Sequence, residues 1–167
     1  MTGVLLVGGA SRRFGTPKAL AEIDGETLAE RAWRVLGDAC DERIAVGKVA
    51  DALPLPFPLL DDGSAVRAPV AGVVAGLRAA AFDVCVFLPV DCPRITPSTL
   101  RRLAAAAPAV SPTGPLPGAF TRAQLPLFER KLGKGDYSLR DVEAEVLELD
   151  ERELANVNTP ADLRAVR

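Results

Sequence analysis

Two uninterrupted apolar runs, each leading to a glycine or an acid, constrain the fold of this chain more than any other feature. Residues 3–7 read Gly-Val-Leu-Leu-Val and run into Gly8, and residues 84–88 read Val-Cys-Val-Phe-Leu and lead to Asp91. Continuous apolar runs of this length are typical of parallel strands that are buried on both faces. Such strands need helices above and below them, so the two runs favour an α/β fold.

The segments around these runs carry further helix and strand signals. Further strands are expected at residues 43–46, 59–60 and 146–149, and helices at residues 26–36 (ended by Gly37), 70–80, from Pro97 to about Ala106, 123–132 and after Pro160. The proline-rich segment 108–117 is expected to be a loop or an irregular edge. Strands that alternate with helices imply right-handed crossovers, and 167 residues suit one domain. We therefore predict a single-domain, Rossmann-like three-layer sandwich over residues 1–167, with a mostly parallel sheet.

Charge and hydropathy exclude several classes of protein. The chain has 20 basic and 22 acidic residues and lacks the basic excess of a nucleic-acid-binding protein. No apolar run approaches the roughly 18 residues of a membrane span, and the N-terminus lacks the basic start of a signal peptide. We therefore expect a cytoplasmic protein with no nucleic-acid or membrane partner.

The residue types available for chemistry are restricted as well. The chain has no His, and its cysteines, Cys40, Cys85 and Cys92, form no C-x-x-C pair. These facts argue against a structural zinc site, a histidine-based triad and imidazole acid–base chemistry. If the protein is an enzyme, carboxylates, Lys, Arg or a hard metal ion must perform the reaction.

A glycine-rich, positively charged loop follows the first expected strand. Residues 6–20 read LVGGASRRFGTPKAL and include Arg12, Arg13 and Lys18, and residues 1–21 contain no acid. Glycines allow backbone N–H groups to approach a phosphate, and the cations supply charge for a polyphosphate. The glycine spacing matches neither a Walker loop nor G-x-G-x-x-G. Phosphate binding is the favoured interpretation, and an ordinary surface turn is the alternative.

Four motifs in the chain resemble those of the nucleotidyltransferases related to molybdenum cofactor guanylyltransferase. The loop at residues 6–18 is similar to the signature L-x-G-G-x-S-x-R-x-G-x-x-K. PVAGVVAGL at residues 69–77 resembles the P-L-A-G helix, FLPVDCPRI at residues 87–95 resembles the P-x-D-x-P motif at a strand end, and NVNTPADL at residues 156–163 resembles N-x-N-T-P-x-D/E-L. The motifs occur in the family's order and span nearly the whole chain.

The resemblance implies a role for individual residues. It implies that Leu6, Gly8 and Gly9 make backbone contacts around the nucleotide, and that Lys18 and Arg13 bind its phosphates. It implies further that the acid of the third motif, Asp91, binds Mg²⁺, a hard ion that one or two carboxylates and substrate phosphates commonly hold.

Several positions have competing interpretations. Asp61 and Asp62 follow an expected strand and could cap a loop or bind ribose or base; the ungapped match to the second motif favours Asp61 slightly. Asn158 precedes the helix start at residues 159–162, so it could lie over the active site or only shape the turn. Asp91 itself could be a turn residue, and Cys92 beside it is expected to be inert.

Two departures from the family pattern affect the expected function. Gly47 stands where the family usually presents an Asn near the nucleotide, so recognition of base or ribose could differ. The segment 108–120 lacks the His often found in the family and the second half of the chain is short, which affects acceptor binding more than nucleotide binding.

The resemblance implies an Mg²⁺-dependent nucleotidyltransferase that moves GMP from GTP onto the terminal phosphate of the molybdopterin cofactor and releases pyrophosphate. GTP and molybdopterin are the expected substrates. A relative that uses CTP or another phosphate acceptor is one alternative, and a catalytically silent nucleotide-binding relative is another. A nicotinamide oxidoreductase is a more distant alternative, because the dinucleotide glycine pattern is missing.

Overall fold

The computed structural model describes residues 1–8 and 16–166, and in these residues seven strands form one sheet in the order β5-β4-β1-β6-β8-β7-β9. The strands of this sheet are β1 (Thr2–Val7), β4 (Glu42–Gly47), β5 (Leu59–Asp61), β6 (Val84–Pro89), β7 (Ala109–Ser111), β8 (Gly114–Thr121) and β9 (Glu145–Val146). A separate antiparallel pair joins β2 (Glu22–Ile23) to β3 (Glu26–Thr27). β1 pairs in parallel with β4 and β6, and β4 pairs in parallel with β5, whereas β8 runs antiparallel to β6. The predicted α/β fold with a mostly parallel sheet is confirmed.

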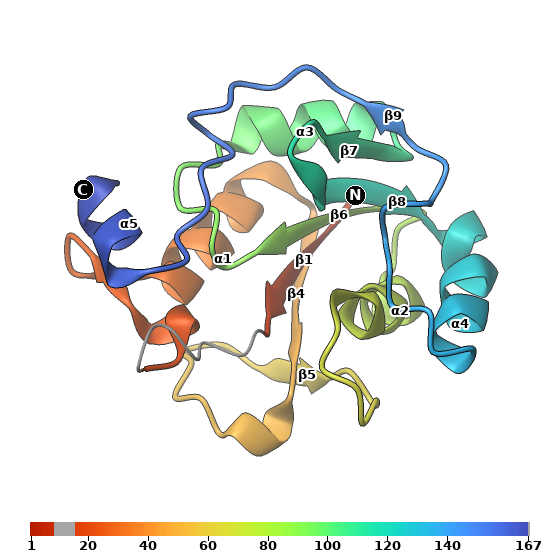
Figure 1. Ribbon diagram of the computed structural model, residues 1–167, viewed down its shortest axis with the longest axis horizontal. Coiled ribbons are helices and arrows are strands. Elements are labelled where there is room, and N and C mark those ends of the chain that lie inside the picture. Colours follow the sequence, from red (N-terminus) through yellow and green to blue (C-terminus); the bar gives the residue numbers. More distant parts are fainter. Residues whose placement is uncertain (9–15, 167) are drawn as a thin grey trace.

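Helices cover both faces of this sheet (Figure 1). The helices are α1 (Leu28–Ala39), α2 (Pro69–Ala79), α3 (Pro97–Ala105), α4 (Leu125–Gly133) and α5 (Pro160–Ala165), with short 3₁₀ turns η1 (Lys18–Leu20), η2 (Val49–Asp51) and η3 (Arg122–Gln124). α1 and α3 pack on one face, and α2 and α4 pack on the other. The arrangement is the predicted three-layer sandwich. None of the helices in the described residues is both long enough and apolar enough to cross a bilayer.

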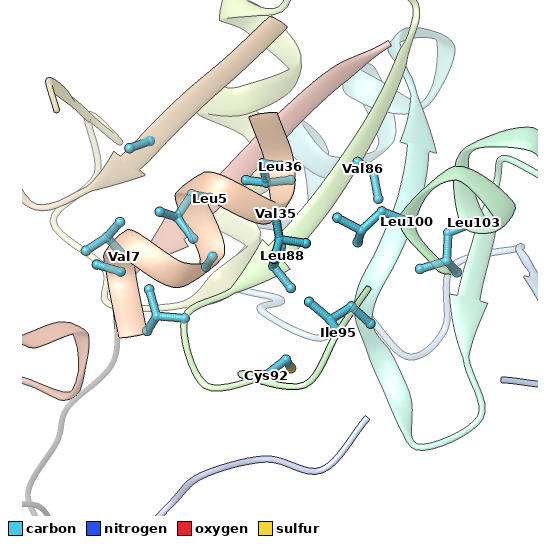
Figure 2. Close-up of a cluster of buried hydrophobic side chains, with 14 of the residues drawn as sticks. Leu5, Val7, Val35, Leu36, Val86, Leu88, Cys92, Ile95, Leu100 and Leu103 are labelled. Atoms are coloured by element: carbon cyan, nitrogen blue, oxygen red, sulfur yellow. The ribbon is translucent and has the colours of Figure 1, made fainter. Parts of the chain in front are cut away.

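Alternation along the central strands divides the core between these two faces. Leu5 and Leu88 lie on the face covered by α1 and α3, where they belong to one cluster with Val35 and Leu100 (Figure 2). Val4, the neighbour of Leu5 in β1, belongs to the cluster on the α2 side. Because each strand buries both of its faces, its sequence is an uninterrupted apolar run.

One predicted helix end is wrong, because α1 continues past Gly37 to Ala39. A Cβ at Gly37 would lie 2.5 Å from the guanidinium of Arg43. That guanidinium donates a hydrogen bond to the carbonyl of Trp33 and lies 4.4 Å from the centre of its ring. The glycine therefore makes room for a side chain from β4 and does not end the helix.

Residues 108–117 were expected to form a loop or an irregular edge; the loop is wrong, because this segment contributes β7 and the first half of β8, but the strand pairing is irregular. The pairing of β7 with β8 shifts between Val110 and Ser111, so that Val110 faces Gly118 and Ser111 faces Gly114. Residues 115–117, with two prolines, lie in this irregularity, where no regular ladder requires their N–H groups. The prolines therefore do not prevent strand pairing.

Candidate active site

A pocket opens at the carboxyl ends of β1 and β4, beside the start of α2. It is lined by Leu6, Gly8, Val46, Gly47, Lys48, Asp62, Arg67, Ala68, Pro69 and Gly72. The described residues enclose about 110 Å³, which is less than the roughly 300 to 1,000 Å³ of pockets that hold a whole small-molecule ligand. The pocket is therefore of a size to accept one ring-shaped part of a ligand. Its position follows the rule that parallel sheets bind ligands at the carboxyl ends of their strands.

A buried ion pair forms one wall of the pocket. Nζ of Lys48 lies 2.6 Å from Oδ1 of Asp62, and their side chains are 12% and 8% exposed. Lys48 also donates to the carbonyl of Ser64, and Oδ1 of Asp62 accepts from the Ser64 N–H at 2.9 Å. Lys48 directly follows β4 and is one of only four lysines in the chain. It was not predicted from the sequence, where its place directly after a strand is only a weak signal.

Of the two neighbouring acids, Asp62 lines the pocket and Asp61 does not. The Asp61 carboxylate accepts hydrogen bonds from the backbone N–H groups of Gly63 and Val49 at 2.8 and 2.9 Å. These bonds lower the pKa of Asp61 below its usual value. Asp61 is exposed and caps the loop after β5, which is one of the two roles considered for it.

The absence of a side chain at Gly47 has a steric cause in this protein. A Cβ at Gly47 would lie 2.8 Å from the carbonyl oxygen of Val7 and 3.4 Å from Leu59. Gly47 pairs with Val7 at the end of the β1–β4 ladder. An Asn at this position, as the family pattern would have it, requires the end of β1 to move.

Replacement of Gly47 by Ala is accordingly expected to lower the free energy of unfolding by about 1 to 3 kcal/mol, the usual cost of overpacking. Gly114→Ala is the matched control, because a Cβ there meets no atom within 4 Å. The control variant is expected to be as stable as the parent or slightly more stable. Urea denaturation of both variants measures the difference, and equal stabilities would contradict this steric account.

A second polar group, formed by Lys18, Asp91 and Asn158, lies on the other side of β1. Nζ of Lys18 lies 3.1 Å from Oδ2 of Asp91 and 3.0 Å from Oδ1 of Asn158. The Lys18 and Asp91 side chains are 17% and 24% exposed. Lys18 begins η1, and Asp91 follows β6. The structure thus brings together three predicted site residues that are up to 140 positions apart in the chain.

Asn158 is held in place by its neighbours. The N–H of Val157 donates to the carbonyl of Asp91 at 2.9 Å, which ties this segment to the end of β6. Thr159 caps α5 as predicted, and the carboxylate of Asp162 accepts from the N–H groups of Asn158 and Thr159. These bonds lower the pKa of Asp162. The helix start therefore both shapes the turn and aims the Asn158 amide at Lys18.

The oxygens around Lys18 suit a hard divalent cation such as Mg²⁺. One carboxylate oxygen and one amide oxygen converge on a single ammonium at about 3 Å, and such oxygens are the donors that Mg²⁺ prefers. The described residues hold no cluster of three or more His, Cys, Asp or Glu side chains that could bind a metal alone. A cation at Asp91 would therefore complete its shell with water or with ligand phosphates.

Cys92 lies next to Asp91 but is suited to no covalent chemistry. Its thiol is buried and donates to Oδ1 of Asn156 at 3.0 Å. Burial, together with the charge of Asp91, raises the pKa of the thiol well above its usual value. The thiol stays protonated and unreactive, as expected.

The structure places most of the predicted site residues around the carboxyl end of β1. Leu6 and Gly8 line the pocket on one side, and the group formed by Lys18, Asp91 and Asn158 lies on the other side. Gly9 and Arg13 lie outside the described residues, and their roles stay predictions. The arrangement combines a ring-sized pocket with a cationic and oxygen-rich group at one edge of the sheet.

A family model and a related protein show what this chain is similar to. Residues 3–148 match the family model of the MobA-like NTP transferase domain. A protein of Chloroflexus aggregans named "Probable molybdenum cofactor guanylyltransferase" is 31% identical over 194 residues, which cover 100% of this chain and 93% of that protein.

Two solved structures share the fold. Molybdopterin-guanine dinucleotide biosynthesis protein A of Archaeoglobus fulgidus superimposes with a TM-score of 0.82 at 22% identity, over 99% of this chain and 96% of that one. The 2-C-methyl-D-erythritol 4-phosphate cytidylyltransferase of Thermus thermophilus has a TM-score of 0.73 at 21% identity, over 98% of this chain and 96% of that one. At these identities the two structures support the fold alone.

Proposed function

The chain belongs to the MobA-like NTP transferase family, and on this premise we propose that it transfers GMP from GTP to the terminal phosphate of the molybdopterin cofactor. An oxygen of the acceptor phosphate forms a bond to the α-phosphorus of GTP. The bond from that phosphorus to the bridging oxygen breaks, and pyrophosphate leaves. The named relative from C. aggregans supports both the guanylyl donor and the acceptor.

The observation that carries this proposal is that a ring-sized pocket and a charged group lie on the two sides of the end of β1. Leu6 and Gly8 line a pocket of ring size, and the end of β6 holds Lys18 and Asp91 3.1 Å apart. A nucleoside triphosphate needs both environments, because its base is flat and uncharged while its phosphates are anionic. The base enters the pocket, and the phosphates extend across β1 towards Lys18.

The mechanism needs positioning and charge more than proton transfer. A phosphate acceptor is already ionised at neutral pH, so no general base is required, and the absence of His is no obstacle. Lys18 binds phosphate oxygens and neutralises the charge that develops in the transition state. Arg13 adds a second cation, and the N–H groups of Gly8 and Gly9 hold the leaving pyrophosphate.

Asp91 and Asn158 are the residues that hold Mg²⁺ in this proposal. When bound, Mg²⁺ supplies electrostatic stabilisation of the phosphate charge and orients the triphosphate. Before the metal and the nucleotide bind, the ammonium of Lys18 keeps the two oxygen ligands together.

The nucleotide assignment predicts a binding preference of roughly tenfold to a thousandfold for GTP over CTP and ATP. The physical reason is that a base with the wrong pattern leaves buried polar groups unpaired at about 1 to 3 kcal/mol each. Competition of the three nucleotides against one labelled nucleotide in the presence of Mg²⁺ measures this preference. Equal affinities for the three nucleotides would contradict the guanylyl assignment.

A cytidylyl donor is the second candidate function. Gly47 keeps this candidate open, because a glycine at this position removes one possible contact to the base and so weakens the selection of guanine. Tighter binding of CTP in the same competition supports this candidate. A pyrophosphate-release assay with defined nucleotides and the molybdopterin acceptor then tests transfer itself, and binding without release would indicate a catalytically silent relative.

A further inference from the structure

We propose that the Lys48–Asp62 pair selects the base of the nucleotide, with Asp62 accepting from the N1–H and 2-amino groups of guanine and Lys48 donating to O6. The inference rests on the proposed function, because it assigns a specificity to the same pocket. Neither Lys48 nor Asp62 belongs to any of the four motifs that resemble those of the family.

The pair lies where a base would enter. Lys48 and Asp62 line the pocket together with Leu6 and Gly8, the residues that follow the β1 strand. Both side chains are about nine-tenths buried, and charged groups are rarely buried to this extent unless they are paired. The two charges therefore stay together at the wall of the pocket, where a ring that occupies it would meet their remaining hydrogen-bonding groups.

The pair has hydrogen-bonding capacity left over on the ligand side. Oδ1 of Asp62 already accepts from Lys48 and from the Ser64 N–H, while Oδ2 has no hydrogen-bond partner among the described residues. Lys48 has three N–H donors, of which one points at Asp62 and one at the Ser64 carbonyl. Among residues 1–8 and 16–166, Oδ2 of Asp62, with two lone pairs, and one N–H donor of Lys48 therefore have no partner, and they belong to side chains in direct contact.

This combination is complementary to guanine in particular. Guanine presents the acceptor O6 beside two donors, N1–H and the 2-amino group. Adenine and cytosine present an amino group where guanine has O6 and a ring acceptor where guanine has N1–H. Either base would place a donor against the Lys48 ammonium and an acceptor against the Asp62 carboxylate. Such mismatches leave charged groups unpaired, so the pair rejects both bases.

The neighbouring glycine explains why these two residues take this role. A side chain at Gly47 would press against the carbonyl of Val7, so the polar contact that the family usually places there cannot come from this position. The next residue along the chain, Lys48, enters the same pocket, and Asp62 balances its charge. The pair thus supplies polar recognition in a pocket that lacks the usual side chain.

A purely structural role for the pair makes a different prediction. Lys48 and Asp62 join the segment after β4 to the segment after β5, and this link could serve only to hold the two segments together. In that case, substitutions would change the stability of the protein and the affinity for all nucleotides equally. The order of preference among bases would stay the same.

The test compares the binding of GTP, ITP, XTP and CTP to the full chain in the presence of Mg²⁺. ITP lacks the 2-amino group, and XTP carries an acceptor in its place. The parent protein is expected to bind GTP about tenfold to a hundredfold more tightly than ITP, since ITP lacks one hydrogen bond to a charged group. In Asp62→Asn this difference is expected to disappear and XTP to bind at least about tenfold more tightly than GTP, because an amide can donate to the xanthine oxygen. Asp38→Asn, an exposed residue of α1, is the matched control and keeps the parent's order.

A second variant keeps the test valid if the buried lysine left unpaired in Asp62→Asn prevents folding. Lys48→Met combined with Asp62→Asn removes both charges and is expected to prefer XTP to GTP as well. A folded variant, single or double, that retains the parent's preference for GTP over both ITP and XTP overturns the inference and leaves the proposed function intact. A parent protein that binds no GTP overturns both.

Discussion

Nucleotidyl transfer by Asp91→Asn is expected to be roughly a thousandfold slower than by the parent protein, a loss of several kcal/mol of transition-state stabilisation. Asn has the size of Asp and can still accept a hydrogen bond from Lys18, but it lacks the negative charge that holds Mg²⁺. The side chain is one-quarter exposed at the end of β6, so the fold should survive the change. Turnover at saturating Mg²⁺ and the binding of Mg²⁺ in a titration calorimeter both measure the effect.

Asp38→Asn serves again as the control for removal of one negative charge, because Asp38 is exposed on α1. It should leave turnover and metal binding unchanged. Near-normal turnover by Asp91→Asn, with Mg²⁺ binding as in the parent, would contradict the assignment of Asp91 as a metal ligand. Asp91 would then be a turn residue that happens to lie beside Lys18.

Lys18→Ala is expected to reduce the rate by about a hundredfold to a thousandfold, corresponding to about 2.7 to 4 kcal/mol by analogy with the removal of one oxyanion-hole donor. The ammonium lies between Asp91 and Asn158 and is positioned to meet a phosphate as well. Because partly exposed ion pairs contribute little to stability, the melting temperature should move by no more than about 2 to 4 °C. Rate measurements and thermal melts on the same preparations separate the two effects.

Lys134→Ala is the matched control for Lys18→Ala, because Lys134 is an exposed lysine at the end of α4. Its rate should equal that of the parent. If Lys18→Ala instead lost its stability while its folded fraction turned over normally, Lys18 would be a structural residue. A loss of rate without a loss of stability supports phosphate binding.

The sequence predicted the sheet well because its central strands are buried on both faces. β1 and β6 have no solvent-facing side, so their residues form unbroken apolar runs that need no partner to be recognised. For residues 108–117 the prolines left both a loop and an irregular edge open, and the structure shows irregular strand pairing. Whether a proline disturbs a strand depends on which N–H groups the neighbouring strand needs, and that is decided by the register of pairing.

Some residues of the candidate site were likewise predicted from the sequence, and others were found only in the structure. Lys18, Asp91 and Asn158 were predicted from motifs, and the structure adds that they meet at distances of about 3 Å. Lys48 was not predicted, because a lysine after a strand is most often solvated. The choice between Asp61 and Asp62 also stayed open, since adjacent acids in a loop look alike in a sequence.

The sequence alone determined the α/β class of this protein, the family to which it belongs and the edge of the sheet where its candidate site lies, because these depend on local patterns of apolar, glycine and acidic residues. Only the tertiary structure decided that Asp62 faces the pocket while Asp61 caps a loop. It also decided that the polar side chain in the pocket comes from Lys48 and not from position 47. The physical reason is that these outcomes depend on contacts between segments that are distant in the chain. The carbonyl of Val7 excludes a side chain at position 47, and the burial of Lys48 requires a carboxylate beside it.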